Sequence, residues 1–192
     1  IFGFPRLSVP AVIALVAVLH SVEAILMFVD GERNASPIYM QDRSGRVVGA
    51  FSLQKFWPLP LAALMAIVTG AEIEKELIQM PDWWPLFKPL QEAGEGKQVV
   101  FVLLPVIAAL GYGDVAISRL PGDKARNSAR NLMVYSGLLL GAALLAERSV
   151  FMQVVASLAA PLGHDLVIRI GEKGEERGQP LFAGSERGVR VL

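Results

Sequence analysis

The sequence has no cysteine and only two histidines among its 192 residues. Disulfides, thiolate nucleophiles and cysteine-ligated metal sites are therefore excluded. Charged residues are also scarce, at 19% of the chain, compared with about 25% in an average soluble domain. Basic and acidic residues number 18 each, so the net charge is zero and no basic excess indicates a nucleic-acid partner.

Familiar catalytic motifs are missing as well. A zinc metalloprotease needs H-E-x-x-H on one helix, but here His164 is followed by Asp165, and Ile168 stands where the second histidine belongs. The intramembrane serine-protease pattern Gly-x-Ser-Gly has Val134 in place of its first glycine. No glycine-rich phosphate loop is present. We therefore predict no catalytic residue, no cofactor and no metal site.

Long apolar runs are what the sequence does have. Val99–Ser118 is 20 residues long with a single charge, Asp114, and as a helix it would measure about 30 Å, the thickness of a bilayer core. The alternative is a soluble helical domain with an unusually apolar core. We predict an all-α, polytopic membrane protein with about five transmembrane or re-entrant helices, at residues 9–29, 56–71, 99–118, 132–146 and 149–166.

The charges between these runs predict an orientation. Residues 119–130 carry four basic side chains and one acid, and such loops stay on the cytoplasmic side. Residues 30–55 and the tail after His164 are then cytoplasmic, and the acidic residues 72–98 lie outside. Residues 132–163 are too long for one upright span, so we expect either two spans or a span and a re-entrant helix, with Glu147 and Arg148 near a boundary.

A short β-hairpin is predicted within the first polar connection. Pro37–Met40 and Arg46–Ala50 flank the turn-forming residues Asp42–Gly45, a pattern typical of two strands joined by a tight turn.

Five polar residues interrupt the apolar runs or end them. His20 and Glu23 share one face of the first predicted helix, where a carboxylate in lipid must be paired or protonated. They indicate a proton or ligand site, or alternatively a buried hydrogen bond between helices, which the sequence favours. His164 and Asp165 could converge with them to bind a cation or relay protons; otherwise they cap the last helix. Asp114 is a further intramembrane polar candidate.

Glycines and tryptophans provide two further signals. Gly137 and Gly141 form G-x-x-x-G, which lets helices pack closely in lipid. Trp57, Trp83 and Trp84 are predicted to be interface anchors, as tryptophans are enriched at membrane surfaces. The alternative for the adjacent pair is a ligand-stacking platform.

The pattern changes after Asp165. Leu166–Ile170 is strand-like, and residues 171–179 form a charged, glycine-containing stretch that we expect to be a solvated linker. The chain starts without methionine and stops within a second strand-like run, Gly188–Leu192. We therefore expect a fragment of a longer protein.

This order of features resembles a known family. The Pro-Leu-Gly-His-Asp junction, the strand-like run, the charged linker and the stretches Gln179–Phe182 and Arg187–Leu192 are similar to the MinJ-like multi-pass membrane PDZ-domain proteins of Gram-positive bacteria. The resemblance implies a transmembrane domain over residues 1–165 and, over residues 166–192, a linker and the first strand of a truncated PDZ domain. The carboxylate-binding loop of a PDZ domain is missing, so no peptide-binding residue can be assigned.

The resemblance also implies a function. It indicates a scaffold or adaptor in the bacterial plasma membrane that recruits partner proteins, with a role in placing the cell-division site. Its partners would be the lipid bilayer, other membrane or cell-division proteins, and a second copy of the chain. The alternative is a membrane enzyme or transporter that uses His20 and Glu23.

Overall fold

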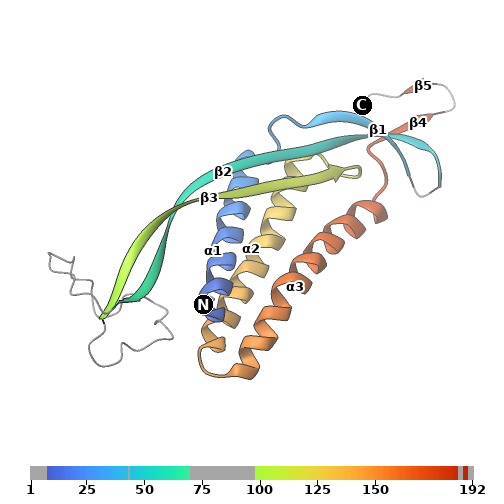
Figure 1. Cartoon of the computed structure of the whole chain (residues 1–192). Coiled ribbons are helices and arrows are strands. Elements are labelled where there is room, and N and C mark those ends of the chain that lie inside the picture. Colours follow the sequence, from blue (N-terminus) through green and yellow to red (C-terminus); the bar gives the residue numbers. More distant parts are fainter. Residues whose placement is uncertain (1–7, 43, 70–97, 186–187, 190–192) are drawn as a thin grey trace.

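The computed structural model of the chain describes residues 8–42, 44–69, 98–185 and 188–189. It combines three helices with an antiparallel sheet (Figure 1). The helices are α1 (Val9–Asp30), α2 (Pro121–Ala146) and α3 (Val150–Arg177). The strands are β1 (Ser36–Gln41), β2 (Val47–Thr69), β3 (Gln98–Ala116), β4 (Phe182–Ser185) and β5 (Gly188–Val189). The fold is therefore mixed, and the prediction of an all-α protein with five helices is wrong.

Two of the five predicted spans are strands. Residues 56–71 and 99–118 fall largely in β2 and β3, which pair antiparallel from Phe51↔Ala116 to Thr69↔Gln98. Prolines give a physical reason, because a proline in a helix interior costs about 3 kcal/mol. Pro58 and Pro60 would destabilise a helix over residues 56–71, and Pro105 would lie in the interior of a helix over residues 99–118.

The same prolines are compatible with the edges of a sheet. Beyond Ser52, β2 pairs only with β3 within the described residues, so both strands are edge strands there. Edge strands accept proline because its missing N–H need not face a partner strand. Pro58, Pro60 and Pro105 thus interrupt the edges of the long hairpin, and such interruptions oppose pairing with further strands.

The other three predicted spans are helical. Residues 9–29 match α1, whereas 132–146 and 149–166 are parts of α2 and α3, which are longer than predicted. The turn at residues 147–149 separates α2 from α3, and the Ser149 side chain caps α3 by accepting a 3.2 Å hydrogen bond from the Phe151 amide. Residues 132–163 are therefore two helices and not one.

The predictions for the tail fail in part. Leu166–Ile170 is helical, and α3 continues through the expected linker to Arg177. Lys, Glu and Arg side chains dominate residues 171–177 and are good helix formers, and an ion pair of 2.6 Å joins Asp165 to Arg169 one turn on. Beyond this helix, β4 returns to the sheet and pairs with β2 at Val48↔Ala183 and Gly49↔Phe182.

The predicted hairpin is confirmed. β1 pairs with β2 from Ser36↔Ser52 to Gln41↔Val47. Its turn is held by Asp42, whose Oδ1 accepts hydrogen bonds from the Ser44 amide (2.8 Å), the Ser44 hydroxyl (2.6 Å) and the Arg46 amide (2.9 Å). Gly45 adopts φ = 77°, a conformation that glycine takes without strain.

This turn leads to a prediction for Asp42. The hydrogen bond from the Ser44 hydroxyl, with those from the Arg46 amide and guanidinium, holds the pKa of the carboxyl well below its ordinary value of 3.8. A depressed folded-state pKa stabilises the hairpin above about pH 3.8, and this stabilisation is lost as the pH falls towards the folded-state value. A carboxyl-carbon NMR titration should give a midpoint below 3.8, and Ser44→Ala should raise it. A midpoint at or above 3.8 in the unmodified chain contradicts this account of the turn.

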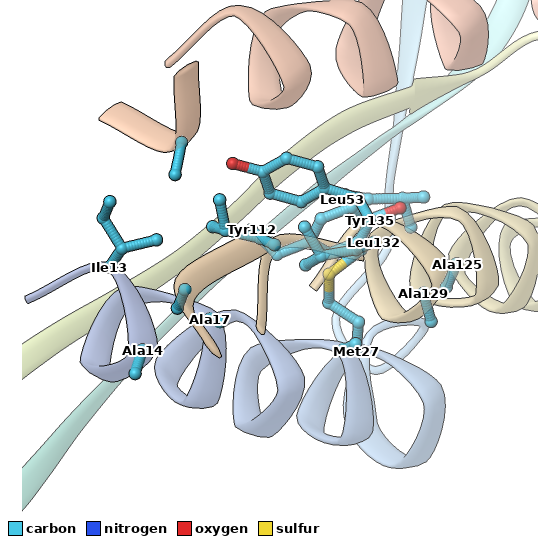
Figure 2. Close-up of a cluster of buried hydrophobic side chains, with 14 of the residues drawn as sticks. Ile13, Ala14, Ala17, Met27, Leu53, Tyr112, Ala125, Ala129, Leu132 and Tyr135 are labelled. Carbon is cyan, nitrogen blue, oxygen red and sulfur yellow. The ribbon is translucent and has the colours of Figure 1, made fainter. Parts of the chain in front are cut away.

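The hydrophobic core lies between α1, α2 and the part of the sheet that contains Leu53 of β2 and Tyr112 and Ala116 of β3. Figure 2 shows Leu53 and Tyr112 from the strands next to Met27 of α1 and Leu132 of α2, all of them buried. Small side chains let α1 and α2 approach closely, namely Ala14, Ala17, Ala24, Ala125, Ala129 and Ala143. α3 contributes much less, since Ala156 and Glu175 are its only buried residues.

The outward faces of the helices are apolar. On α3, large hydrophobic side chains point outward at Phe151, Val155, Leu158, Leu162 and Leu166, and this spacing of three and four residues places them on one face. By length and composition, all three helices of the described chain could cross a membrane.

Candidate functional site

A cleft of about 680 Å³ lies beneath the sheet, between α3 and the pair formed by α1 and α2. Figure 1 shows α3 diverging from α1 and α2 towards the sheet end. The lining includes carboxyl groups from three elements and one imidazole, together with apolar side chains. The polar members are Glu23, Ser52, Gln54, Tyr112, Asp114, Ser128, His164, Glu172, Glu175 and Glu176.

Asp114 is the centre of a buried polar network at one wall of the cleft. Lys124, which is 0% exposed, places its Nζ 3.1 Å from Asp114 Oδ1 and also donates to the Gly171 carbonyl at 3.1 Å. Ser128 donates a 2.9 Å hydrogen bond to Asp114 Oδ2. Burial, followed by the negative charge of Asp114, raises the pKa of Tyr112 well above its ordinary value, so this phenol stays protonated.

Glu175 makes the second buried polar network. Its Oε2 accepts three hydrogen bonds, from the Ile117 amide (3.0 Å), the Ser118 amide (2.9 Å) and the Ser118 hydroxyl (3.0 Å). Arg119 Nε lies 3.6 Å from Oε1, beyond ordinary hydrogen-bond distance. Through these contacts α3 holds the chain that links β3 to α2.

Three rings meet near the middle of the helices. The His20 ring centroid lies 5.0 Å from that of His164 and 5.7 Å from that of Tyr135, in edge-to-face arrangements. His20 Nδ1 donates to the Val16 carbonyl at 2.8 Å, so its Nε2 is left as the acceptor of the neutral ring. Tyr135 donates to the Ala160 carbonyl and ties α2 to α3. Two neighbouring imidazoles can exchange protons through water.

The structure thus brings together part of the predicted constellation. His20, Glu23 and His164 lie close together, and Glu23 also interacts with the backbone of Gly111 on β3. Asp165 is exposed and pairs with Arg169, so it does not join them. His164 and Asp165 do not cap the last helix either, because α3 continues past them. Within the described residues, no group of three or more side chains could hold a metal ion.

The remaining predicted residues lie elsewhere. Trp57 donates a 3.3 Å hydrogen bond to Asp30 at the sheet end of α1. Gly137 and Gly141 are exposed on α2, and a Cβ added to either would meet nothing within 4 Å. Trp83 and Trp84 are outside the described residues.

The sequence interpretation missed Lys124, Glu175 and Tyr135. Lys124 belongs to the basic stretch 119–130, and Glu175 lies in the charged stretch 171–179 that predicts a linker. Neither local pattern indicates that these side chains are buried. Lys124 contacts Gly171, 47 residues away in the chain, and Glu175 contacts Ile117, 58 residues away. One weak signal for Lys124 was available, because the lone Asp114 of an apolar run requires a cationic partner.

The chain matches no family model, no curated protein and no solved structure. The resemblance to the MinJ-like family therefore stays a prediction.

Proposed function

We propose that this chain is an integral membrane scaffold whose three helices cross the bilayer. The observation that supports it is the large number of exposed hydrophobic side chains on the outward faces of three helices that are long and apolar enough to cross a membrane. α3 exposes Phe151, Leu158 and Leu162 at 57–68% of their surface, an arrangement that suits lipid better than water.

The distribution of basic residues supports a cytoplasmic sheet end. The sheet end of the bundle gathers the basic side chains Arg33, Arg46, Lys55, Arg119, Lys124, Arg126 and Arg177, whereas the 147–149 turn at the opposite end has Arg148 alone. Short loops rich in lysine and arginine remain in the cytoplasm. The proposed orientation agrees with the sequence prediction for residues 30–55, for residues 119–130 and for the tail after His164, whereas residues 72–98, which were predicted to lie outside, are not among the described residues.

The sheet supplies a surface for partner proteins. β1 is the last strand in the sheet order, so its outer edge is unpaired within the described chain. Tyr39 on this strand is 80% exposed. An exposed strand edge can accept an extended segment of another protein through backbone hydrogen bonds. We propose that partners dock here, beside the bacterial plasma membrane, and that these partners include cell-division proteins.

Fluorescence microscopy of a fusion protein in a Gram-positive host tests this role. We expect enrichment at the division septum, and a Tyr39→Pro variant that disturbs the β1 edge should lose it. His20→Ala should keep the septal pattern, because its side chain lies in the bundle. An even distribution around the cell membrane by the unmodified chain contradicts the division-site role.

A second candidate function is favoured by the ring cluster of His20, Tyr135 and His164. Ionisable side chains within membrane-crossing helices often belong to proton or ion pathways. As a transporter or membrane enzyme, the protein would depend on His20 and Glu23. Loss of septal localisation in well-folded His20→Ala and Glu23→Gln variants would favour this candidate over the scaffold.

A further inference from the structure

Two arginines near the sheet end of α2 have no carboxylate partner within the described residues. Arg126 and Arg130 are exposed, and none of the ion pairs in the described part of the chain includes either of them. Arg130 donates a 2.7 Å hydrogen bond to the neutral side chain of Asn127, which leaves its charge in place. An arginine keeps its proton in a protein, so two positive charges stand on this part of the surface.

Both arginines share one face of α2 with apolar side chains. Steps of four, three and eleven residues link Arg126, Arg130, Met133 and Leu144, and each step is close to a whole number of helical turns. Met133 is 39% exposed and Leu144 is 52% exposed. This face therefore points away from the core and changes from basic to apolar along the helix axis.

The position of the arginines matches the boundary of a membrane span. Residues 131–146 of α2 carry no charge and measure about 24 Å as a helix, slightly less than a hydrocarbon core of about 30 Å. With α2 across the bilayer, as proposed above, Arg126 and Arg130 lie at the level of the lipid headgroups. The apolar part of the face, from Met133 to Leu144, is about 16 Å long and so covers about one leaflet. Asp123, in the first turn of α2, lies further from the bilayer.

A second copy of the chain is a poor occupant for this face. Gly137 and Gly141 also lie there and have open space beside them, so a neighbouring helix would meet no side chain at these two positions. In a symmetric pair of chains with the same membrane orientation, however, Arg126 and Arg130 of one copy would face the same arginines of the other, and like charges placed together are unfavourable. A molecule with an anionic end and a long apolar part suits both ends of the face.

We propose that this face of α2 binds an anionic phospholipid of the cytoplasmic leaflet. The phosphate accepts hydrogen bonds from the guanidinium groups of Arg126 and Arg130, whose planar N–H groups suit phosphate oxygens. An acyl chain lies along Met133 and Leu144. The inference rests on the proposed crossing of the bilayer by the helices, and it adds a class of lipid and the residues that select it.

Native mass spectrometry of the full chain, released from detergent micelles, tests the proposal. Phosphatidylglycerol and phosphatidylcholine with the same acyl chains are supplied at equal concentration. We expect one phosphatidylglycerol to bind with a preference of at least about tenfold, because each arginine near the headgroups favours an anionic lipid. Equal occupancy by the two lipids would overturn the proposal. Displacement of phosphatidylglycerol by equimolar inorganic phosphate would also overturn it, because the site would then belong to the free anion.

Matched glutamine variants locate the site. Arg126→Gln combined with Arg130→Gln should remove the preference, while the free energy of unfolding changes little because both side chains are exposed. Arg169→Gln is the control, since Arg169 is 64% exposed on α3 but pairs with Asp165 at 2.6 Å; the preference should be unchanged. Equal losses in the double variant and the control would show a response to general charge and would contradict the assigned face.

Two further measurements separate this inference from its alternatives. Alkaline washing of membranes tests the crossing of the bilayer by itself, and we expect the chain to stay in the membrane. Release of the chain would overturn the proposed function and this inference together, whereas retention without a lipid preference would overturn this inference alone. Gly137→Cys tests for a second copy, because the chain has no other cysteine. Disulfide-linked dimers of that variant in the membrane would show that another chain, and not a lipid, covers the face.

Discussion

Replacement of Lys124 with methionine is expected to lower the free energy of unfolding by about 3–5 kcal/mol. The Lys124 side chain is 1% exposed and that of Asp114 is 18% exposed, with 3.1 Å between their charged atoms. Methionine keeps most of the apolar stem but removes the ammonium group. Asp114 then remains largely buried with only neutral donors, and the Gly171 carbonyl loses its partner as well. Thermal and denaturant unfolding in nanodiscs, followed by circular dichroism, measures the change.

Two further variants decide whether the buried pair is the cause. Lys173→Met changes an exposed lysine on α3 and should shift stability by no more than about 0.5 kcal/mol. Adding Asp114→Asn to Lys124→Met should recover part of the lost stability, because it removes the uncompensated charge. Equal effects of Lys124→Met and Lys173→Met would show that Lys124 is not buried as described.

A methyl group added at Gly163 is expected to destabilise the contact between α2 and α3 by about 1–3 kcal/mol. The Cβ of Gly163→Ala would lie 2.5 Å from Tyr135 Cε2 and 3.0 Å from Cδ2. Tyr135 cannot move aside freely, since it is 8% exposed and its hydroxyl donates to the Ala160 carbonyl. Denaturant unfolding of the purified chain provides the measurement.

Gly137→Ala and Gly141→Ala are the matched controls. Both glycines lie in α2 with open space where the methyl group would go, so alanine should be neutral or stabilise by up to about 1 kcal/mol through its helix propensity. The same two variants test the predicted G-x-x-x-G contact, because a second copy packed there would be displaced and the oligomer weakened. If Gly163→Ala behaves like these controls, α3 does not pack on Tyr135 as described.

The sequence predicted the local features well. The long apolar run of α1 and the turn residues of the β1–β2 hairpin determine their own conformations, and the predicted helix and hairpin are both confirmed. The apolar runs of β2 and β3 are different, because length and hydrophobicity alone do not distinguish a buried helix from a strand. Weighing Pro58, Pro60 and Pro105 more heavily would have favoured strands.

The candidate site was predictable only in part. His20 and His164 drew attention as rare polar residues in apolar runs, and the helices bring their rings within 5.0 Å. Asp165 is also a polar residue at the end of an apolar run, but it points away from the cleft. It follows His164 directly, and successive residues of a helix are rotated by about 100° around its axis. The burial of Lys124 and Glu175 depends on tertiary contacts that no local pattern encodes.

Cysteine labelling tests the membrane orientation most directly, since the chain has no cysteine of its own. Tyr39→Cys lies on the exposed face of β1, and Glu147→Cys lies in the turn between α2 and α3. With a membrane-impermeant maleimide on intact cells, Glu147→Cys should react at once and Tyr39→Cys only after permeabilisation. Reaction of Tyr39→Cys in intact cells, or of both positions only after permeabilisation, would contradict three helices crossing the bilayer with the sheet in the cytoplasm.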